Sequence, residues 1–129
     1  MSVPYVYDAG ALLAAERGDR RMVQIHHLAT SGGTVPVVPA PVLSQVWRDG
    51  RRQALLARFL QGCRVEPFDE AAARASGSLL GRSATSDVVD AAVVVACLRL
   101  GAVVVTSDRH HLQHLVDAIG ESLPAVVTV

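Results

Sequence analysis

Lysine is absent from the sequence, and several other features are scarce. All 12 lysine-or-arginine positions are arginine, and 12 acidic residues balance them to a formal net charge of zero. Without lysine, no mechanism that needs a catalytic or phosphate-binding lysine is open to this chain. The neutral balance argues against a basic nucleic-acid coat protein, although a local basic patch is still compatible with it. Aromatic residues make up only 4% of the chain, so we do not expect nucleobase stacking to be its main mode of binding.

Cysteines, long apolar runs and glycine-rich loops are also scarce. Cys63 and Cys97 are the two cysteines, too few for a disulfide scaffold, which predicts a reduced, cytoplasmic protein. Residues 1–8 lack the positive region and apolar run of a signal peptide. The longest apolar run, residues 91–98, is too short to cross a bilayer. Neither a P-loop nor a dinucleotide-binding glycine motif is present.

Hydrophobic residues, by contrast, make up half of the 129-residue chain. This length and composition predict a single domain, residues 1–129, with a substantial buried core. Such an apolar chain is also expected to expose an apolar patch, and such patches mark interfaces with partners.

Strand and helix patterns alternate along the chain. The strand patterns are continuous apolar runs, which are typical of a parallel sheet buried on both faces. We therefore expect an α/β fold with a short parallel sheet and helices on both faces. The expected strands are 3–7, 35–38, 64–67, 102–106 and 125–129. The expected helices are 9–17, 19–28, 41–50, 53–60, 69–80, 87–100 and 108–119, with Thr85 or Ser86 capping the one that begins at Asp87.

Acidic residues follow the strands of this predicted sheet. Asp8 comes directly after the first strand, and Asp108 lies two residues after the valine-rich fourth strand. Asp87 and Asp90 share one face at the start of the helix before that strand. In a parallel sheet, functional groups gather at the carboxyl ends of the strands. We therefore expect these four carboxylates to meet at one edge, with Gln45 near them on the helix after the second strand.

A cluster of carboxylates has a simple chemical use. Unpaired carboxylates raise one another's pKa, and a bound divalent cation relieves their repulsion. Mg²⁺ takes oxygen ligands and can assist hydrolysis of a phosphodiester. The alternative for Asp87 and Asp108 is that each is only the N-cap of its helix. Asp8 and Asp90 are harder to explain in that way, because each lies beside apolar residues.

Three segments resemble the PIN-domain family, specifically VapC-type toxins of toxin–antitoxin pairs. They are "YVYDAGALLAAERGD" at residues 5–19, "PVVPAPVLSQVWRDGRR" at 36–52 and "TSDVVDAAVVVACLRLGAVVVTSDRHHLQHL" at 85–115, the last being the most specific. The resemblance runs nearly end to end. It implies a Rossmann-like sheet, a Mg²⁺- or Mn²⁺-dependent endoribonuclease, a homodimer, and inhibition by a small antitoxin protein.

The resemblance also implies roles for particular residues. Asp8, Asp90 and Asp108 match the family's catalytic, metal-binding acids, and Asp87 matches an additional acid of some members, so it ranks second. Thr106 matches a threonine whose hydroxyl can bond the first carboxylate.

Two positions depart from the family. Gln45 stands where the family normally has Glu, and His111 stands where it often has an acid. Both changes make the site less acidic, so we expect weaker metal binding, slow or absent cleavage, and tolerance of Mn²⁺ or a softer ion.

Basic side chains near the predicted edge are candidate RNA contacts. Arg48, Arg51, Arg52 and Arg109 have guanidinium groups that suit phosphate oxygens, although a solvated surface is an equal alternative. His110, His111 and His114 share one helix, but no further ligand close in sequence completes a zinc site.

The leading interpretation is therefore a metal-dependent endoribonuclease that acts as a toxin. The first alternative is a catalytically impaired domain that binds RNA or an antitoxin, on the evidence of Gln45 and His111. The second is a phosphoryl-transfer domain of receiver or phosphatase type. The missing lysine argues against it, as does the lack of a second Asp two residues after Asp8.

Overall fold

The computed structural model describes residues 3–85, 87–123 and 125–129, and its centre is a parallel β-sheet. Within these residues the sheet has five strands in the order β3-β2-β1-β4-β5, and every neighbouring pair is parallel. The expected α/β fold with a parallel sheet is thus confirmed. The strands are β1 (Tyr5–Tyr7), β2 (Val37–Pro39), β3 (Arg64–Glu66), β4 (Val103–Thr106) and β5 (Ala125–Thr128).

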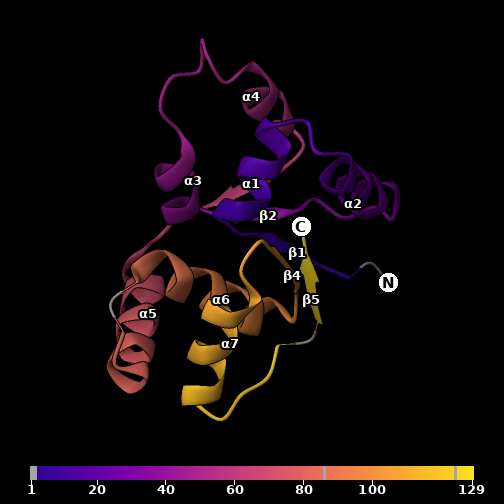
Figure 1. The fold of residues 1–129 in the computed structure, drawn as a ribbon. Coiled ribbons are helices and arrows are strands. Elements are labelled where there is room, and N and C mark those ends of the chain that lie inside the picture. Colours follow the sequence, from indigo (N-terminus) through magenta and orange to yellow (C-terminus); the bar gives the residue numbers. More distant parts are fainter. Residues whose placement is uncertain (1–2, 86, 124) are drawn as a thin grey trace.

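Helices lie on both sides of the sheet (Figure 1). In the view of Figure 1, the first four helices lie above the sheet and the last three below it. They are α1 (Ala9–Glu16), α2 (Arg20–Ser31), α3 (Ala40–Val46), α4 (Ala54–Leu60), α5 (Glu70–Ser83), α6 (Val88–Leu100) and α7 (Arg109–Ala118). None of these helices is both long and apolar enough to span a bilayer, in the part of the chain that the structure describes.

The core forms where α1 and α6 pack against the central strands. Val6, Val104 and Val105 are fully buried because both faces of the sheet are covered. Helix α6 is apolar around most of its circumference, since it packs against the sheet, α5 and α7. Ala91, Val93 and Val94 are fully buried on it.

Two expected helix ends are wrong by a few residues. The helix expected to run to Gly50 ends at Val46, because Trp47 adopts an extended backbone. Helix α5 continues to Ser83, beyond the expected end at Leu80. The cap of α6 is Asp87 itself, which accepts the N–H of Asp90, rather than Thr85. The alternative cap, Ser86, lies outside the described residues.

A close approach near the start of α1 explains one glycine. Gly10 lies against Ser107, in the turn between β4 and α7. A Cβ atom at position 10 would overlap the Ser107 side chain and lie 2.9 Å from its backbone nitrogen. Only glycine therefore lets the start of α1 pack against the turn that carries Asp108.

We predict that Gly10→Ala destabilises the protein by about 1–3 kcal/mol, the usual cost of overpacking. Gly77→Ala is the matched control, because a Cβ at that exposed position of α5 meets nothing within 4 Å. It should stabilise by up to about 1 kcal/mol through helix propensity. Urea unfolding measures both changes. Equal stability of the two variants would contradict the packing argument.

Candidate functional site

The candidate site lies at the carboxyl ends of β1 and β4, where the order of strands reverses. Strands β2 and β3 lie on one side of β1, and β4 and β5 on the other. In open parallel sheets, ligands bind in the crevice at such a reversal. Asp8 follows β1, and Asp108 follows β4 after one intervening residue. The backbone N–H of Asp8 donates to the Val105 carbonyl at 3.1 Å, which joins the two strand ends.

Asp8 is a buried carboxyl, with a relative exposure of 8%. It caps α1 by accepting the Ala11 N–H at 3.0 Å. Burial raises the pKa of Asp8, and the nearby Asp108 raises it further. Hydrogen bonds from the Thr106 hydroxyl and from the backbone N–H groups of Ala11 and Gly10 oppose that rise. The fold therefore holds a carboxyl in a poorly solvated position and supplies donors that favour its charged form.

Asp108 caps α7 and is bonded mainly by one neighbour, His111. One oxygen, Oδ1, accepts the His111 N–H at 3.3 Å, and Oδ2 lies 2.8 Å from His111 Nδ1. The Asp108 backbone N–H donates to Thr106 Oγ1 at 2.9 Å. Thr106 thus lies between the two strand-end acids. The departure at position 111 has a structural result, because His111 occupies both oxygens of Asp108.

Asp90 lies in the first turn of α6, one turn after Asp87. Asp87 Oδ1 accepts the Asp90 N–H at 2.9 Å, and the two carboxyl groups also share a hydrogen bond. The pKa of Asp90 is raised to about 6, mainly by burial and then by Asp87. Asp8 raises it slightly, whereas His111 lowers it. Asp87, Asp90, His111, His114, Thr85 and Leu115 together line a cavity of about 330 Å³.

The acids at this edge are close enough to affect one another's ionisation. Asp8 interacts with Asp108 and with Asp90, and Asp90 interacts with Asp87. Oxygen donors with mutual repulsion suit a hard divalent cation, so the donor chemistry fits Mg²⁺ or Mn²⁺. The side chains are not closed around one point, however. Within the described residues, no three His, Cys, Asp or Glu side chains are grouped tightly enough to hold a metal ion.

Gln45 does not line the acidic cavity. It is exposed on α3 and faces a neighbouring hollow of about 400 Å³, which also contains Arg48, Arg52 and Glu16. The predicted basic cluster is thus partly gathered around Gln45. Arg51 and Arg109 are exposed and line neither of these two hollows. Glu16, on α1, is an acid to which the sequence analysis gave no role, because nothing in the sequence links it to position 45.

Gln53 is a positioning residue that sequence reasoning missed. Its side chain is only 7% exposed, and it bonds the turn that follows α3 at three points. Oε1 accepts the N–H groups of Arg48 and Asp49 at 2.8 and 3.0 Å, and Nε2 donates to the Val46 carbonyl at 2.9 Å. The arginine-bearing turn is therefore fixed by one buried amide. A glutamine at the start of a helix gives no signal of such a role in the sequence.

The histidines of α7 are divided between different surroundings. His111 and His114 line the acidic cavity, whereas His110 does not. Two histidines and two aspartates thus share a cavity, but the absence of a closed three-residue group among the described side chains applies to them too. Cys63 and Cys97 are free thiols away from that cavity.

Comparisons with known proteins place this fold. No protein-family model matches the sequence. No curated protein matches it either. Solved structures do match. VapBC2 from Rickettsia felis, in a crystal structure bound to a DNA fragment from its promoter, is similar with a TM-score of 0.69 and 14% identity. This match covers 98% of this chain and 98% of that one.

A second similar structure is PAE2754 from Pyrobaculum aerophilum. It matches with a TM-score of 0.62 and 16% identity, over 98% of this chain and 92% of that one. At these identities the likeness concerns the fold. The expected resemblance to PIN-domain, VapC-type proteins is confirmed at that level, and the chain has a PIN-like fold.

The raised pKa of Asp90 predicts a pH dependence of stability. In the unfolded chain its pKa returns to 3.8, whereas the folded value is about 6. Between these values the folded protein holds a proton that the unfolded chain releases, so the free energy of unfolding falls as pH rises through this interval. Asp90→Asn should therefore be more stable than wild type at about pH 8, by about 1 kcal/mol after allowance for solvent screening.

Urea unfolding of metal-free protein at several pH values measures this effect. The advantage of Asp90→Asn should shrink towards about pH 4, where both forms are neutral at this position. Asp117→Asn, which removes an exposed carboxylate on α7, is the control and should show no such trend. An advantage that stays constant with pH would contradict the assignment.

Proposed function

We propose that this chain is a Mg²⁺- or Mn²⁺-dependent endoribonuclease and the toxin of a type II toxin–antitoxin pair. The observation that carries the proposal is the coupling of Asp8, Asp90 and Asp108. They come from three separate segments, lie at the reversal of the sheet and affect one another's pKa. A purely structural use of three such acids would be expected to pair each with a cation, and no arginine forms an ion pair with any of them among the described residues.

Each acid has a role in this proposal. Asp8, Asp90 and Asp108 would hold the cation, with Asp87 as a secondary ligand that also positions Asp90. When bound, the ion would neutralise charge that develops on the phosphodiester and lower the pKa of a coordinated water. Thr106 positions Asp8 and Asp108 through its hydroxyl. Cleavage would proceed by attack of water on the RNA phosphate.

The hollow around Gln45 is the proposed path of the RNA backbone. Arg48 and Arg52 line it, and Arg51 and Arg109 are exposed nearby in the sequence. Guanidinium groups bind phosphate oxygens in a fixed fork. Gln45 would orient water or RNA, because its amide has both donors and an acceptor but no charge.

A catalytically impaired domain that binds RNA or an antitoxin is the second candidate. Specific observations favour it. His111 occupies both oxygens of Asp108, and Gln45 adds no charge to the site. Loss of one acid and occupation of another would weaken cation binding while leaving the fold intact.

The proposed partners are an antitoxin protein and a second copy of the chain. An apolar groove of about 550 Å³ lies between α3, α4 and β3. Trp47 and Val65, which are 37% and 38% exposed, contribute to it. Apolar surface of this kind supports a protein partner. We further propose that residues 1–129 act as one domain, in the cytoplasm, where free thiols such as Cys63 and Cys97 persist.

Cleavage of a panel of structured RNAs, with Mg²⁺ and then Mn²⁺, tests the proposal. We expect wild type to cleave and Asp90→Asn to lose at least about 100-fold in rate, the scale on which loss of one charge-stabilising group acts. Gln45→Glu should increase the rate. Asp117→Asn is the control and should cleave like wild type.

The outcomes separate the two candidates. Because Asp90→Asn is expected to be more stable than wild type, its loss of activity cannot be ascribed to unfolding. Cleavage by Gln45→Glu alone would favour the impaired domain. Silence of all variants, including Gln45→Glu, would remove the case for catalysis.

A further inference from the structure

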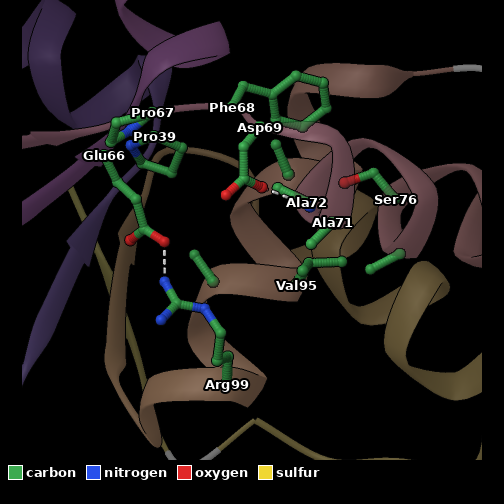
Figure 2. A pocket seen from close by; sticks show the side chains of 13 residues that line it. Pro39, Glu66, Pro67, Phe68, Asp69, Ala71, Ala72, Ser76, Val95 and Arg99 are labelled. Atoms are coloured by element: carbon green, nitrogen blue, oxygen red, sulfur yellow. Dashed lines mark hydrogen bonds and ion pairs between the residues drawn. The ribbon is translucent and has the colours of Figure 1, made fainter.

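A cavity separate from the acidic site lies between the end of β3, α5 and α6. Its volume is about 370 Å³, and Figure 2 shows its lining. Small side chains of the two helices, including Ala72, Ala75 and Ala92, leave the space open, while Phe68 adds an aromatic ring. The Arg99 side chain is 52% exposed, so the cavity opens to solvent at that end. Pockets of this size hold small molecules in other proteins.

Two buried polar atoms in this cavity lack hydrogen bonds. Among the described residues, Glu66 Oε2 and Ser76 Oγ are the buried side-chain oxygen or nitrogen atoms without a hydrogen-bond partner. Both residues line this same cavity. Ser76 is only 1% exposed. Because such atoms are rare in folded proteins and costly, their occurrence in one cavity indicates that something binds there.

Glu66 has one oxygen committed and one available. Its Oε1 forms an ion pair with Arg99 (Figure 2). Its Oε2 lies 3.8 Å from Arg64 Nη2, which is beyond hydrogen-bond distance. A carboxylate oxygen can only accept, so a ligand must offer it an N–H or O–H group.

The charge of the lining favours a cationic ligand. Glu66 and Asp69 contribute two carboxylates, and Arg99 contributes one guanidinium. One Asp69 oxygen accepts the Ala72 N–H as the cap of α5, but its charge is retained. The remaining lining is mostly apolar, which suits the body of an organic molecule.

We infer that the β3–α5–α6 cavity is a binding site for a small organic ammonium ion with an apolar body. Its ammonium group would donate to Glu66 Oε2, with Ser76 Oγ as a second polar contact, and its apolar part would pack on Phe68 and the alanines. This site is independent of the proposed nuclease activity. It assigns a use to Glu66, Ser76 and Arg99, none of which belongs to the candidate active site.

Titration calorimetry with three ligands of similar shape tests the inference. The ligands are phenethylammonium, 2-phenylethanol and 3-phenylpropanoate. We expect phenethylammonium to bind most tightly and 3-phenylpropanoate least. Glu66→Gln should weaken phenethylammonium binding by about tenfold, because a charge-assisted hydrogen bond becomes a neutral one. Ser76→Ala should weaken it by a few-fold and leave the order of the three ligands unchanged.

Thermal unfolding gives an independent readout with a matched control. Without ligand, Ser76→Ala should raise Tm more than Ser78→Ala, because Ser78 is exposed on the same helix. Both changes gain helix propensity, but only Ser76→Ala removes a buried unpaired hydroxyl. Phenethylammonium should then raise the Tm of Ser78→Ala more than that of Ser76→Ala.

Three results would overturn the inference. One is the absence of binding at ligand concentrations up to about 10 mM, which would leave a cavity that holds water only. Another is binding of 3-phenylpropanoate as tight as that of phenethylammonium. The third is phenethylammonium binding that neither Glu66→Gln nor Ser76→Ala changes.

Discussion

The pairing of β1 with β4 is the interaction on which the rest of the structure depends. It joins Tyr5–Tyr7 to Val103–Val105 and continues into the bond from the Asp8 N–H to the Val105 carbonyl. This pairing fixes the point where the strand order reverses. It also fixes the distance between the turns that carry Asp8 and Asp108, with Gly10 allowing those turns to pack closely. The candidate site is therefore a direct result of sheet topology.

Capping and cation binding are complementary uses of the same acids. Asp8, Asp87 and Asp108 each accept a backbone N–H at the start of a helix, so their interpretation as caps is correct in each case. A cap restrains the carboxyl group before any ligand arrives, which lowers the entropy cost of binding. Asp90 caps nothing and is the acid whose raised pKa reflects a position kept at a cost in stability.

Much of the fold was predictable from the sequence, because continuous apolar runs and helix caps are local signals. The parallel sheet, the strand-end positions of Asp8 and Asp108, and the pairing of Asp87 with Asp90 all follow from such signals. Contacts between distant segments were not predictable. The seating of Gln45 beside Glu16, the three bonds of Gln53 and the unpaired atoms of Glu66 and Ser76 depend on side-chain packing across elements. No spacing in the sequence encodes them.

The parallel register also determines when the site can form during synthesis. Tyr5 pairs with Val103, so the centre of the sheet needs segments from nearly opposite ends of the chain. Such long-range pairing is slow, since a large loop must close before the contacts form. Asp8 leaves the ribosome early, but its neighbour Asp108 follows only when most of the chain has been made. The emerging chain therefore has no acidic site, and a nearly finished chain acquires the whole site at once.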